Sequence, residues 1–313
     1  LLAAGTAGTL DEMSDVLDLE SVGGVVTKSI TAQPREGNAT WRILPTEHAG
    51  GQGGAMLNAI GLANIGVDEF AAHVAPRVAE VPCAVIGSVA GFSIDDYVRV
   101  AGVMDDVDAL GAIELNVSCP NVHGGTEFGA DPRALRELLA AVRPVVERKA
   151  LIVKLSPIAV GGPGNTISDL ARAAIDPPNP RPSGPRSRPG ADALTIANTV
   201  PAMAVDVRTR RPRLSNVTGG LSGPAVHPIA VKLVWDVYRS VARDTGTPII
   251  GLGGVTTWQD AAEFILVGAS CVAMGTVLFA DPRAPRRIAR GLERWVRDQG
   301  VASVRDLVGA VRV

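Results

Sequence analysis

The regular alternation of short apolar runs with helical stretches is the feature that most restricts how this chain can fold. Eight apolar runs, most of which end in a glycine, a polar residue or a lysine, occupy residues 1–4, 24–27, 84–88, 112–117, 151–155, 193–197, 248–252 and 271–274. Apolar residues recur with helical spacing between them, at residues 68–81, 94–103, 132–148, 167–174, 228–243, 258–267 and 285–297. Strands that alternate with helices form parallel β-α-β units, so eight units predict an α/β fold of the (β/α)8 barrel type. An open, doubly wound sheet is the rival fold, but no Gly-x-Gly-x-x-Gly motif follows the first run.

Length and composition are consistent with one barrel and exclude several classes of function. At 313 residues, 46% of them hydrophobic, the chain can bury a large core, and we expect a single barrel domain over residues 1–313. The formal net charge of −2 gives no general attraction to nucleic acid or to an anionic membrane. No apolar run reaches the roughly 18 residues of a membrane span. We therefore expect neither nucleic acid nor membrane as a partner.

The cysteines and histidines favour a reducing compartment and no metal site. Cys83, Cys119 and Cys271 are odd in number and widely spaced, which argues against a disulfide framework and for a cytoplasmic protein. The four histidines are scattered and show no metal-ligand spacing. Residues 1–4 follow no charged segment, so we do not expect them to belong to a signal peptide, and the chain begins inside an expected strand.

Two segments depart from a minimal barrel. Residues 31–54 have no clear helical pattern and are rich in Gly, Pro and Thr. They follow the second strand on the catalytic face, where we expect a lid or a small β excursion. Residues 176–190 form a Pro- and Arg-rich inserted loop that follows a helix, so we expect it on the opposite face of the barrel.

Residues 112–125 carry the most informative strand end. An apolar strand over residues 112–117 breaks at Cys119 and Pro120, because proline cannot donate to a sheet ladder. Asn116, Cys119 and Asn121 are therefore delivered together at the mouth of a strand. Amides both donate and accept hydrogen bonds, so the set suits a planar substrate rich in carbonyl and N–H groups. The Cys-Pro-Asn motif alone is equally consistent with a buried cysteine before a turn.

Lysines end two further apolar strands. Lys28 follows the second strand and Lys154 ends the fifth. Burying an ammonium group without a partner is costly, so each lysine is expected to meet an anion or an electron-rich ligand. An internal salt bridge, for example to Glu114, is the alternative for either lysine alone.

Glycine-rich strand ends predict a phosphate site. Gly253 and Gly254 follow the seventh strand, and Gly275 and Thr276 follow the eighth, which is where barrels commonly bind phosphate through backbone N–H groups. Residues 219–223 are predicted to form a third glycine-rich loop, after the sixth strand. Three such loops on adjacent strands favour a phosphorylated cofactor.

Further amides are expected at the same mouth. Asn58 is placed in the loop after the second strand, and Asn198 at the end of the sixth. With Asn116 and Asn121 they make four amides around Cys119. Each buried, unpaired amide costs about 1–3 kcal/mol, so this gathering favours a binding site over core packing.

With these motifs in place, the sequence resembles the class 1 dihydroorotate dehydrogenases, the flavin enzymes of pyrimidine biosynthesis. The resemblance is carried, nearly end to end and in order, by residues 27–38, 56–62, 114–125, 153–157, 216–225, 249–255 and 273–282. Class 1 enzymes have cysteine at the place of Cys119, whereas the membrane-associated class 2 enzymes have serine. In residues 56–62 and 121–132, the amino-acid sequence is most similar to that of subclass 1B.

The resemblance implies FMN lying across the top of the barrel. The residues that would contact FMN are Ala4, Lys28, Ser29, Ser88, Asn116, Lys154, Ala197, Gly223, Gly253, Gly254, Gly275 and Thr276. Those that would hold the substrate are Lys28, Asn58, Ala59, Ile60, Gly61, Leu62, Asn116, Asn121, Asn198 and Thr199. Cys119 would be the base that removes the C5 proton of dihydroorotate while the C6 hydride moves to flavin N5. Lys154 would offset the negative charge that grows on the reduced flavin.

The resemblance also implies partners. In subclass 1B the catalytic chain is a homodimer that associates with an electron-transfer subunit bearing FAD and an iron–sulfur cluster, and electrons pass to NAD. This chain has no cysteine cluster for such a centre, so NAD-linked activity would require the second protein. Subclass 1A enzymes use fumarate instead.

Some positions depart from the family pattern, and two other functions remain open. Residues 38–42 are Asn-Ala-Thr-Trp-Arg in place of Asn-Pro-Thr-Pro-Arg, and Ser88 stands where the family usually has Asn. The segment over residues 45–54 is longer than is usual in the family. The alternatives are a flavin-dependent reductase of another pyrimidine or cyclic amide, and a non-redox phosphate-binding barrel or a barrel that only binds a partner. The unaltered amides speak against the first, and a colourless protein would indicate the second.

Overall fold

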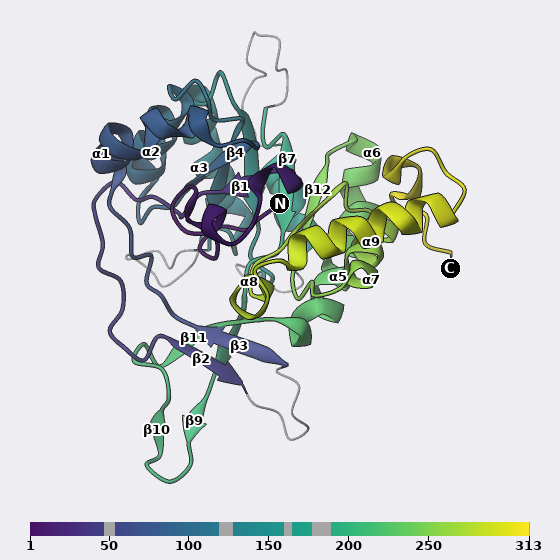
Figure 1. The fold of residues 1–313 in the computed structure, drawn as a ribbon. Helices are drawn as coiled ribbons and strands as arrows, with labels where there is room; N and C mark the ends of the chain where they lie inside the picture. Colours follow the sequence, from purple (N-terminus) through teal and green to yellow (C-terminus); the bar gives the residue numbers. More distant parts are fainter. Residues whose placement is uncertain (47–53, 119–127, 160–164, 177–188, 313) are drawn as a thin grey trace.

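A parallel β-barrel forms the centre of the molecule. The computed structural model describes residues 1–46, 54–118, 128–159, 165–176 and 189–312. Seven strands pair in parallel in the order β1 (Val25–Val26), β4 (Val85–Val89), β5 (Ala112–Asn116), β6 (Ala150–Lys154), β7 (Ala193–Ile196), β12 (Ile249–Leu252) and β13 (Cys271–Ala273). Leu2 bridges Val25 on one side and Met274 on the other, which closes the sheet. The predicted (β/α)8 barrel is confirmed (Figure 1).

The first barrel strand is shorter than predicted. Residues 1–4 were expected to form a strand, but only Leu2 has a bridge to its neighbours. The N–H of Leu2 donates to Gly24 at 2.9 Å, and the N–H of Ala3 donates to Met274 at 2.8 Å. Pairing this brief suffices because Leu2 is completely buried and fixed from both sides.

Helices surround the barrel and follow the predicted positions closely. The long ones are α2 (Ile94–Asp105), α3 (Pro132–Val142), α4 (Ile167–Ile175), α5 (His227–Val237), α7 (Trp258–Leu266) and α9 (Ala284–Asp298). Short α-helical segments are α1 (Val67–Glu69), α6 (Arg243–Thr245) and α8 (Val277–Ala280). Single 3-10 turns are η1 (Glu12–Asp15), η2 (Leu19–Ser21), η5 (Arg143–Val145), η6 (Pro224–Val226) and η8 (Val304–Leu307).

Three predicted helices are not regular α-helices throughout. The one predicted over 132–148 is α-helical only as far as Val142 and continues as the 3-10 turn η5. The stretch predicted over 68–81 continues from α1 as a π-helix, η3 (Phe70–Val74), and a 3-10 helix, η4 (Ala75–Glu80). Pro76 lies in this stretch and has no N–H to donate to the preceding turn, so the α-helical ladder cannot continue through it. The stretch predicted over 228–243 likewise passes from α5 through a π turn, η7 (Tyr238–Ala242), before α6.

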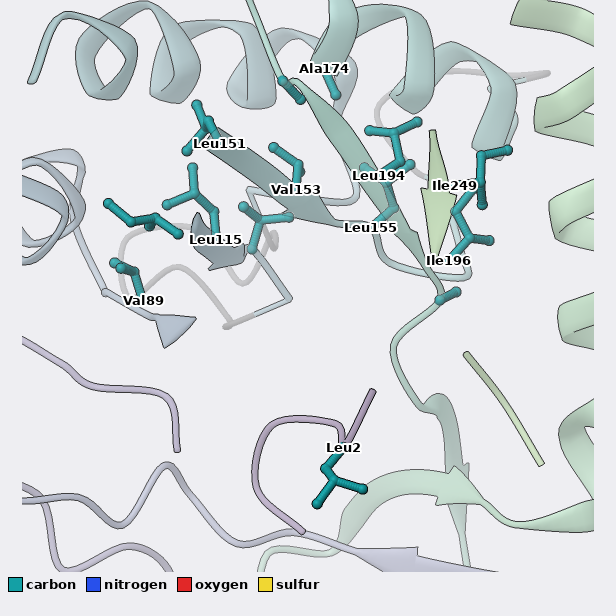
Figure 2. Packing of buried hydrophobic residues seen from close by; sticks show 14 of the residues in the cluster. Leu2, Val89, Leu115, Leu151, Val153, Leu155, Ala174, Leu194, Ile196 and Ile249 are labelled. Carbon is teal, nitrogen blue, oxygen red and sulfur yellow. The ribbon is translucent and has the colours of Figure 1, made fainter. Parts of the chain in front are cut away.

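The main core lies between the barrel and its helices. Strand side chains alternate, so Leu115, Val153 and Leu194 point outward and pack under the helices, as Figure 2 shows. The opposite face of the strands carries a smaller apolar cluster inside the barrel, which includes Val26 and Ile152. Each strand therefore contributes to two cores, which fixes its register and the position of its C-terminal end.

An antiparallel sheet covers one end of the barrel. It has the order β2 (Ile43–Thr46), β3 (Ala55–Asn58), β11 (Thr218–Ser222) and β8 (Val200–Met203), and we call it the roof sheet. Leu44, Leu57 and Leu214 form its own small core. A two-stranded ribbon, β9 (Val205–Asp206) and β10 (Arg211–Pro212), extends away from it (Figure 1).

The roof sheet corrects two predictions. Residues 219–223 were predicted to be a loop, but residues through Ser222 belong to β11 and only Gly223 follows it. Asn58 was placed in a loop, but it ends β3 and pairs with Gly220. The predicted excursion over 31–54 contains β2, while residues 47–53 and most of the predicted insertion, residues 177–188, lie outside the described residues.

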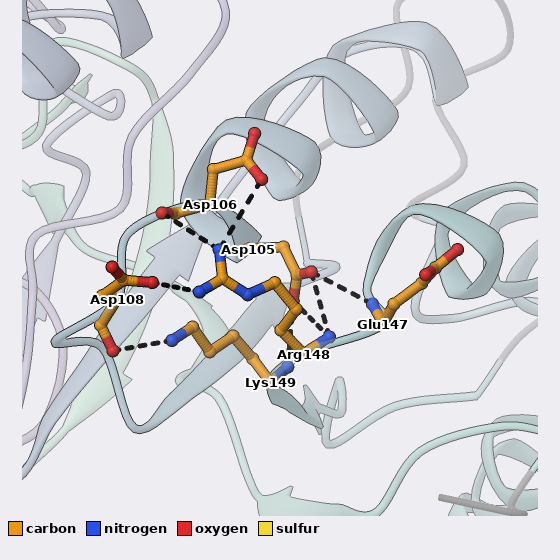
Figure 3. A network of polar contacts seen from close by, with 6 residues as sticks. All are labelled: Asp105, Asp106, Asp108, Glu147, Arg148 and Lys149. Atoms are coloured by element: carbon orange, nitrogen blue, oxygen red, sulfur yellow. Dashed lines mark hydrogen bonds and ion pairs between the residues drawn. The ribbon is translucent and has the colours of Figure 1, made fainter. Parts of the chain in front are cut away.

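A polar network ties the opposite end of the barrel together (Figure 3). The Asp105 carboxylate at the end of α2 accepts the backbone N–H groups of Glu147, Arg148 and Lys149. The Nζ of Lys149 donates to the carbonyl of Asp108 at 2.8 Å, and Arg148 pairs with the Asp108 carboxylate. These contacts join the end of α2 to the segment that leads into β6.

In the described part of the chain, no helix is both long and apolar enough to cross a membrane.

Candidate functional site

A pocket lies between the C-terminal strand ends and the roof sheet, where the predicted site residues meet. Predicted cofactor residues that line it are Ala4, Lys28, Ser29, Asn116, Lys154, Ala197, Gly223, Gly253, Gly254, Gly275 and Thr276. Predicted substrate residues that line it are Lys28, Asn58, Ile60, Leu62, Asn116, Asn198 and Thr199. Ser88, Ala59 and Gly61 are not among the lining residues. Cys119 and Asn121 lie outside the described residues.

Three amides in the pocket are fixed by hydrogen bonds. The Nδ2 of Asn198 donates to Oδ1 of Asn116 at 3.0 Å, and the Nδ2 of Asn116 donates to Oγ of Ser29 at 3.2 Å. Asn58 donates to the carbonyl of Gly220 in the roof sheet at 3.1 Å. Because each amide has a partner, the orientation of its side chain in the pocket wall is defined.

Ser88 supports the pocket from behind. It is completely buried, its hydroxyl lies 2.8 Å from that of Ser29, and its N–H donates to Oγ1 of Thr27 at 2.9 Å. Ser29 is thereby held where it accepts from Asn116. Ser88 therefore lies behind Ser29 in this structure, and its contact with the cofactor, which the resemblance implied, stays a prediction.

Lys28 and Lys154 both reach the pocket. Lys154 is only 6% exposed and lies beside Asn116 in the sheet register. Among the described residues, no carboxylate forms an ion pair with either lysine. Glu114 accepts instead from the hydroxyl of Thr195 at 2.7 Å. The internal salt bridge to Glu114 is therefore not observed, and the ammonium groups are available to an anionic or electron-rich ligand.

The glycine-rich ends of β12 and β13 form an anion cradle. Within the described residues, the N–H groups of Gly254, Gly275 and Thr276 donate to no protein acceptor. Gly254 has φ +68°, and a Cβ there would lie 2.7 Å from the carbonyl oxygen of Gly223. Only glycine allows the chain this conformation and this close approach. Unpaired N–H groups on adjacent strand ends suit a phosphate, so these residues fit the phosphate end of FMN.

Sequence reasoning missed the apolar side chains that the roof sheet and α8 contribute to the pocket wall. Ile43, Met56 and Leu221 line it from the roof sheet, and Phe279 of α8 stands at its rim with 57% of its surface exposed. The strand that contains Leu221 carries two glycines, which indicate a loop as readily as a strand. The alternation of apolar and polar residues that is typical of a strand was therefore not visible in β11.

Comparison with known proteins places the chain in a family. A family profile described as "Dihydroorotate dehydrogenase" matches residues 1–175 and 186–296. The chain belongs to the dihydroorotate dehydrogenase family. Its members are FMN-dependent oxidoreductases that oxidise dihydroorotate in pyrimidine biosynthesis, which agrees with the cradle and the buried lysine.

Curated members of the dihydroorotate dehydrogenase family match over more than nine tenths of their length. The chain is 43% identical over 312 residues to "Dihydroorotate dehydrogenase B (NAD(+)), catalytic subunit" of Pelobacter propionicus, covering 99% of this chain and 93% of that protein. It is 42% identical over 314 residues to the protein of the same name from Geobacter sulfurreducens, covering 100% and 94%. The predicted likeness to subclass 1B is confirmed.

A solved dihydroorotate dehydrogenase shares the fold. The crystal structure of the Eimeria tenella enzyme in complex with ferulenol matches with a TM-score of 0.77, covering 99% of this chain and 84% of that one. The identity is 22%, so this likeness concerns the fold alone. No group of three or more His, Cys, Asp or Glu side chains in the described ranges could hold a metal ion.

Proposed function

We propose that this chain is the catalytic subunit of an NAD-linked dihydroorotate dehydrogenase and converts (S)-dihydroorotate to orotate. The observation that carries the proposal is the junction, in one pocket, of an anion cradle, a buried lysine and a set of fixed amides. The names of the full-length relatives support the NAD-linked type.

The cofactor end of the pocket would be held by backbone groups and by charge. The N–H groups of Gly254, Gly275 and Thr276 would bind the FMN phosphate. When bound, FMN supplies the acceptor for the hydride. Lys154, buried and without a carboxylate partner among the described residues, would place a positive charge where negative charge accumulates during reduction.

The substrate end would be held by amides. Asn58, Asn198 and Thr199 would bind the carboxylate and the pyrimidine edge and so orient the ring. The thiolate of Cys119 would take the proton from C5 while the hydride leaves C6 for flavin N5, and the C5–C6 double bond forms. A cysteine is suited to this because a thiolate is an effective base near neutral pH.

The same reasoning extends to partners and location. Electrons would leave through a second subunit that carries FAD and an iron–sulfur cluster, since the described part of this chain offers no cluster ligands. We propose a homodimer as the catalytic core of that assembly. The unpaired thiols of Cys83 and Cys271 support a cytoplasmic location.

A visible spectrum of the purified protein tests the reaction. We expect a flavin absorption band at about 450 nm that bleaches when dihydroorotate is added under anaerobic conditions. Dihydrouracil, which lacks the carboxylate, serves as the control and should bleach it far more slowly. A flavin that dihydrouracil reduces and dihydroorotate does not would identify a reductase of another cyclic amide. A protein that stays colourless after FMN is supplied would indicate a non-redox barrel.

A further inference from the structure

His227, the first residue of α5, lies directly behind the anion cradle. Its ring Nδ1 is 2.8 Å from the carbonyl oxygen of Gly253. A carbonyl oxygen can only accept, so Nδ1 carries the proton and donates it to Gly253. The residue is 8% exposed, and it is not among those that line the pocket. It therefore acts on the cradle from the protein side.

The far side of the same ring faces two carboxylates of α7. Nε2 lies 3.3 Å from Oε2 of Glu263 and 4.0 Å from Oδ1 of Asp260. The ring also meets the edge of Phe264, with centroids 5.0 Å apart. Asp260 is itself fixed, because it accepts the N–H groups of Thr256 and Thr257 at the start of α7. Nε2 itself has no hydrogen-bond partner among the described residues, so the imidazole is held by its Nδ1 hydrogen bond and by packing against Phe264 of the capped helix α7.

The turn that His227 contacts consists of two glycines and therefore has high intrinsic conformational freedom. Gly253 and Gly254 have φ of +148° and +68°, and glycine is the residue with the largest conformational freedom. A Cβ on Gly254 would lie 2.8 Å from Cβ of His227, so the turn also rests directly on the base of this side chain. The Gly253 carbonyl and the Gly254 N–H belong to one peptide plane, so the hydrogen bond from His227 to that carbonyl also orients the Gly254 N–H.

We propose that His227 is a positioning residue for the FMN phosphate: it fixes the Gly253–Gly254 turn through its Nδ1 proton and transmits the rigidity of α7 to the cradle. The inference rests on the proposed function, because it takes the phosphate of FMN as the anion in the cradle. This role concerns only one end of the cofactor. His227 acts on the phosphate end and not on the isoalloxazine or the substrate.

The test compares FMN with riboflavin, which lacks the phosphate, as ligands of the full chain freed of its flavin. Asparagine can present a donor where Nδ1 stands, whereas glutamine presents its amide near Nε2. We expect His227→Gln to weaken FMN binding about tenfold, the loss of one hydrogen bond, and to leave riboflavin binding unchanged. His227→Asn should stay close to the parent protein for both ligands.

Two further variants keep the test decisive. His227→Leu, which keeps an apolar side chain against Phe264 but has no donor for the Gly253 carbonyl, should weaken FMN binding about tenfold and leave riboflavin binding unaffected. It stands in for His227→Gln if that variant does not fold. His73→Gln is the matched control, because His73 is an exposed histidine that also faces a glutamate, Glu69, at 3.2 Å. It should change neither affinity.

Three results would overturn the inference. They are an unchanged FMN affinity in His227→Gln, an equal loss of riboflavin and FMN affinity, and an Asn variant as weak as the Gln variant. A parent chain that binds riboflavin as tightly as FMN would reject the phosphate cradle itself, and with it the role of His227. A parent chain that binds neither flavin would reject the proposed function.

Discussion

Two buried lysines at the ends of one strand show how a residue's surroundings, rather than its type, make it functional. Lys149 and Lys154 flank β6 and are each 6% exposed. Lys149 donates to the carbonyl of Asp108, within the network of Figure 3. Lys154 reaches the pocket and has no ion-pair partner among the described residues. A strand-end pattern predicts the position of Lys154, but the partner of Lys149 comes from another loop and is not visible in sequence.

We expect Lys154→Gln to slow flavin reduction about 10²- to 10³-fold, since one preorganised positive group is lost where charge develops. The rate of bleaching at about 450 nm after anaerobic mixing with dihydroorotate measures it. Lys149→Gln, at the other end of β6, should leave this rate within about twofold while lowering stability. Equal rate losses in the two variants would show that burial, and not the pocket, is what matters.

Asn198 tests the fixed amides. In Asn198→Asp, a carboxylate oxygen replaces the Nδ2 that donates to Asn116 at 3.0 Å. The hydrogen bond between the two side chains is lost, and the new carboxylate repels an anionic substrate. The KM for dihydroorotate should therefore rise at least about tenfold. Steady-state kinetics over a substrate range will show this. Asn216→Asp changes an exposed amide by the same atom and should leave KM unaltered. A normal KM in Asn198→Asp would remove Asn198 from the substrate site.

The pair of Thr195 and Glu114 concerns stability. The hydroxyl of Thr195 donates to the buried carboxylate of Glu114 at 2.7 Å. Thr195→Val removes that donor, and the free energy of unfolding should fall by about 1–3 kcal/mol in urea titrations. Adding Glu114→Met removes the buried acceptor that has lost its donor and should restore part of the loss. A double variant less stable than either single variant would contradict this account.

At the scale of elements, the parallel strands were predictable, whereas the roof sheet was expected only in part, as the lid or β excursion over residues 31–54 that contains β2. The β5 and β6 segments are short apolar runs bounded by breakers, and their observed bounds differ from the predicted ones by one residue. In β11, Gly220 lies so close to Thr199 that a Cβ would overlap its hydroxyl. The same glycines that the sheet needs for this approach conceal the strand in the sequence.

The roof sheet has its own core, so it can be loosened separately. Leu57 is 2% exposed and packs with Leu44 and Leu214. Leu57→Ala should destabilise the roof sheet by about 2–5 kcal/mol and speed hydrogen exchange in β3 and β11. KM should rise, because Asn58 is carried by β3. Leu138→Ala, in the main core, is the control and should lower global stability without selective exchange in the roof sheet. Uniform exchange in both variants would show that the roof sheet unfolds only with the barrel.

At the scale of the molecule, the barrel gathers residues from distant strand ends, and this was predictable because all parallel strands end on one face. Gly254, Asn116 and Lys28 meet in one pocket for that reason. The support of the pocket was not predictable, since Ser88 and His227 act through other residues. Their hydrogen bonds to Ser29 and Gly253 depend on side-chain geometry that spacing does not encode.

The electron acceptor is also a property of the whole assembly. We expect the isolated chain to be reduced by dihydroorotate within seconds but to pass electrons to NAD negligibly. Adding a subunit that bears FAD and an iron–sulfur cluster should restore NADH formation, which absorbance at about 340 nm follows. Fumarate added to the isolated chain is the control for the other subclass. Rapid NADH formation by the chain alone would contradict the need for a partner.

The roof sheet joins segments that are far apart in the chain: Asn58 donates to Gly220 across 162 positions. A ribosome must therefore release the chain as far as Gly220 before the two can pair. Until then the nascent polypeptide has early strands but no cover over them. Gly254, Gly275 and Thr276 of the anion cradle follow Gly220 in the sequence, so the pocket that would bind flavin is completed only after the last strand of the roof sheet has been made.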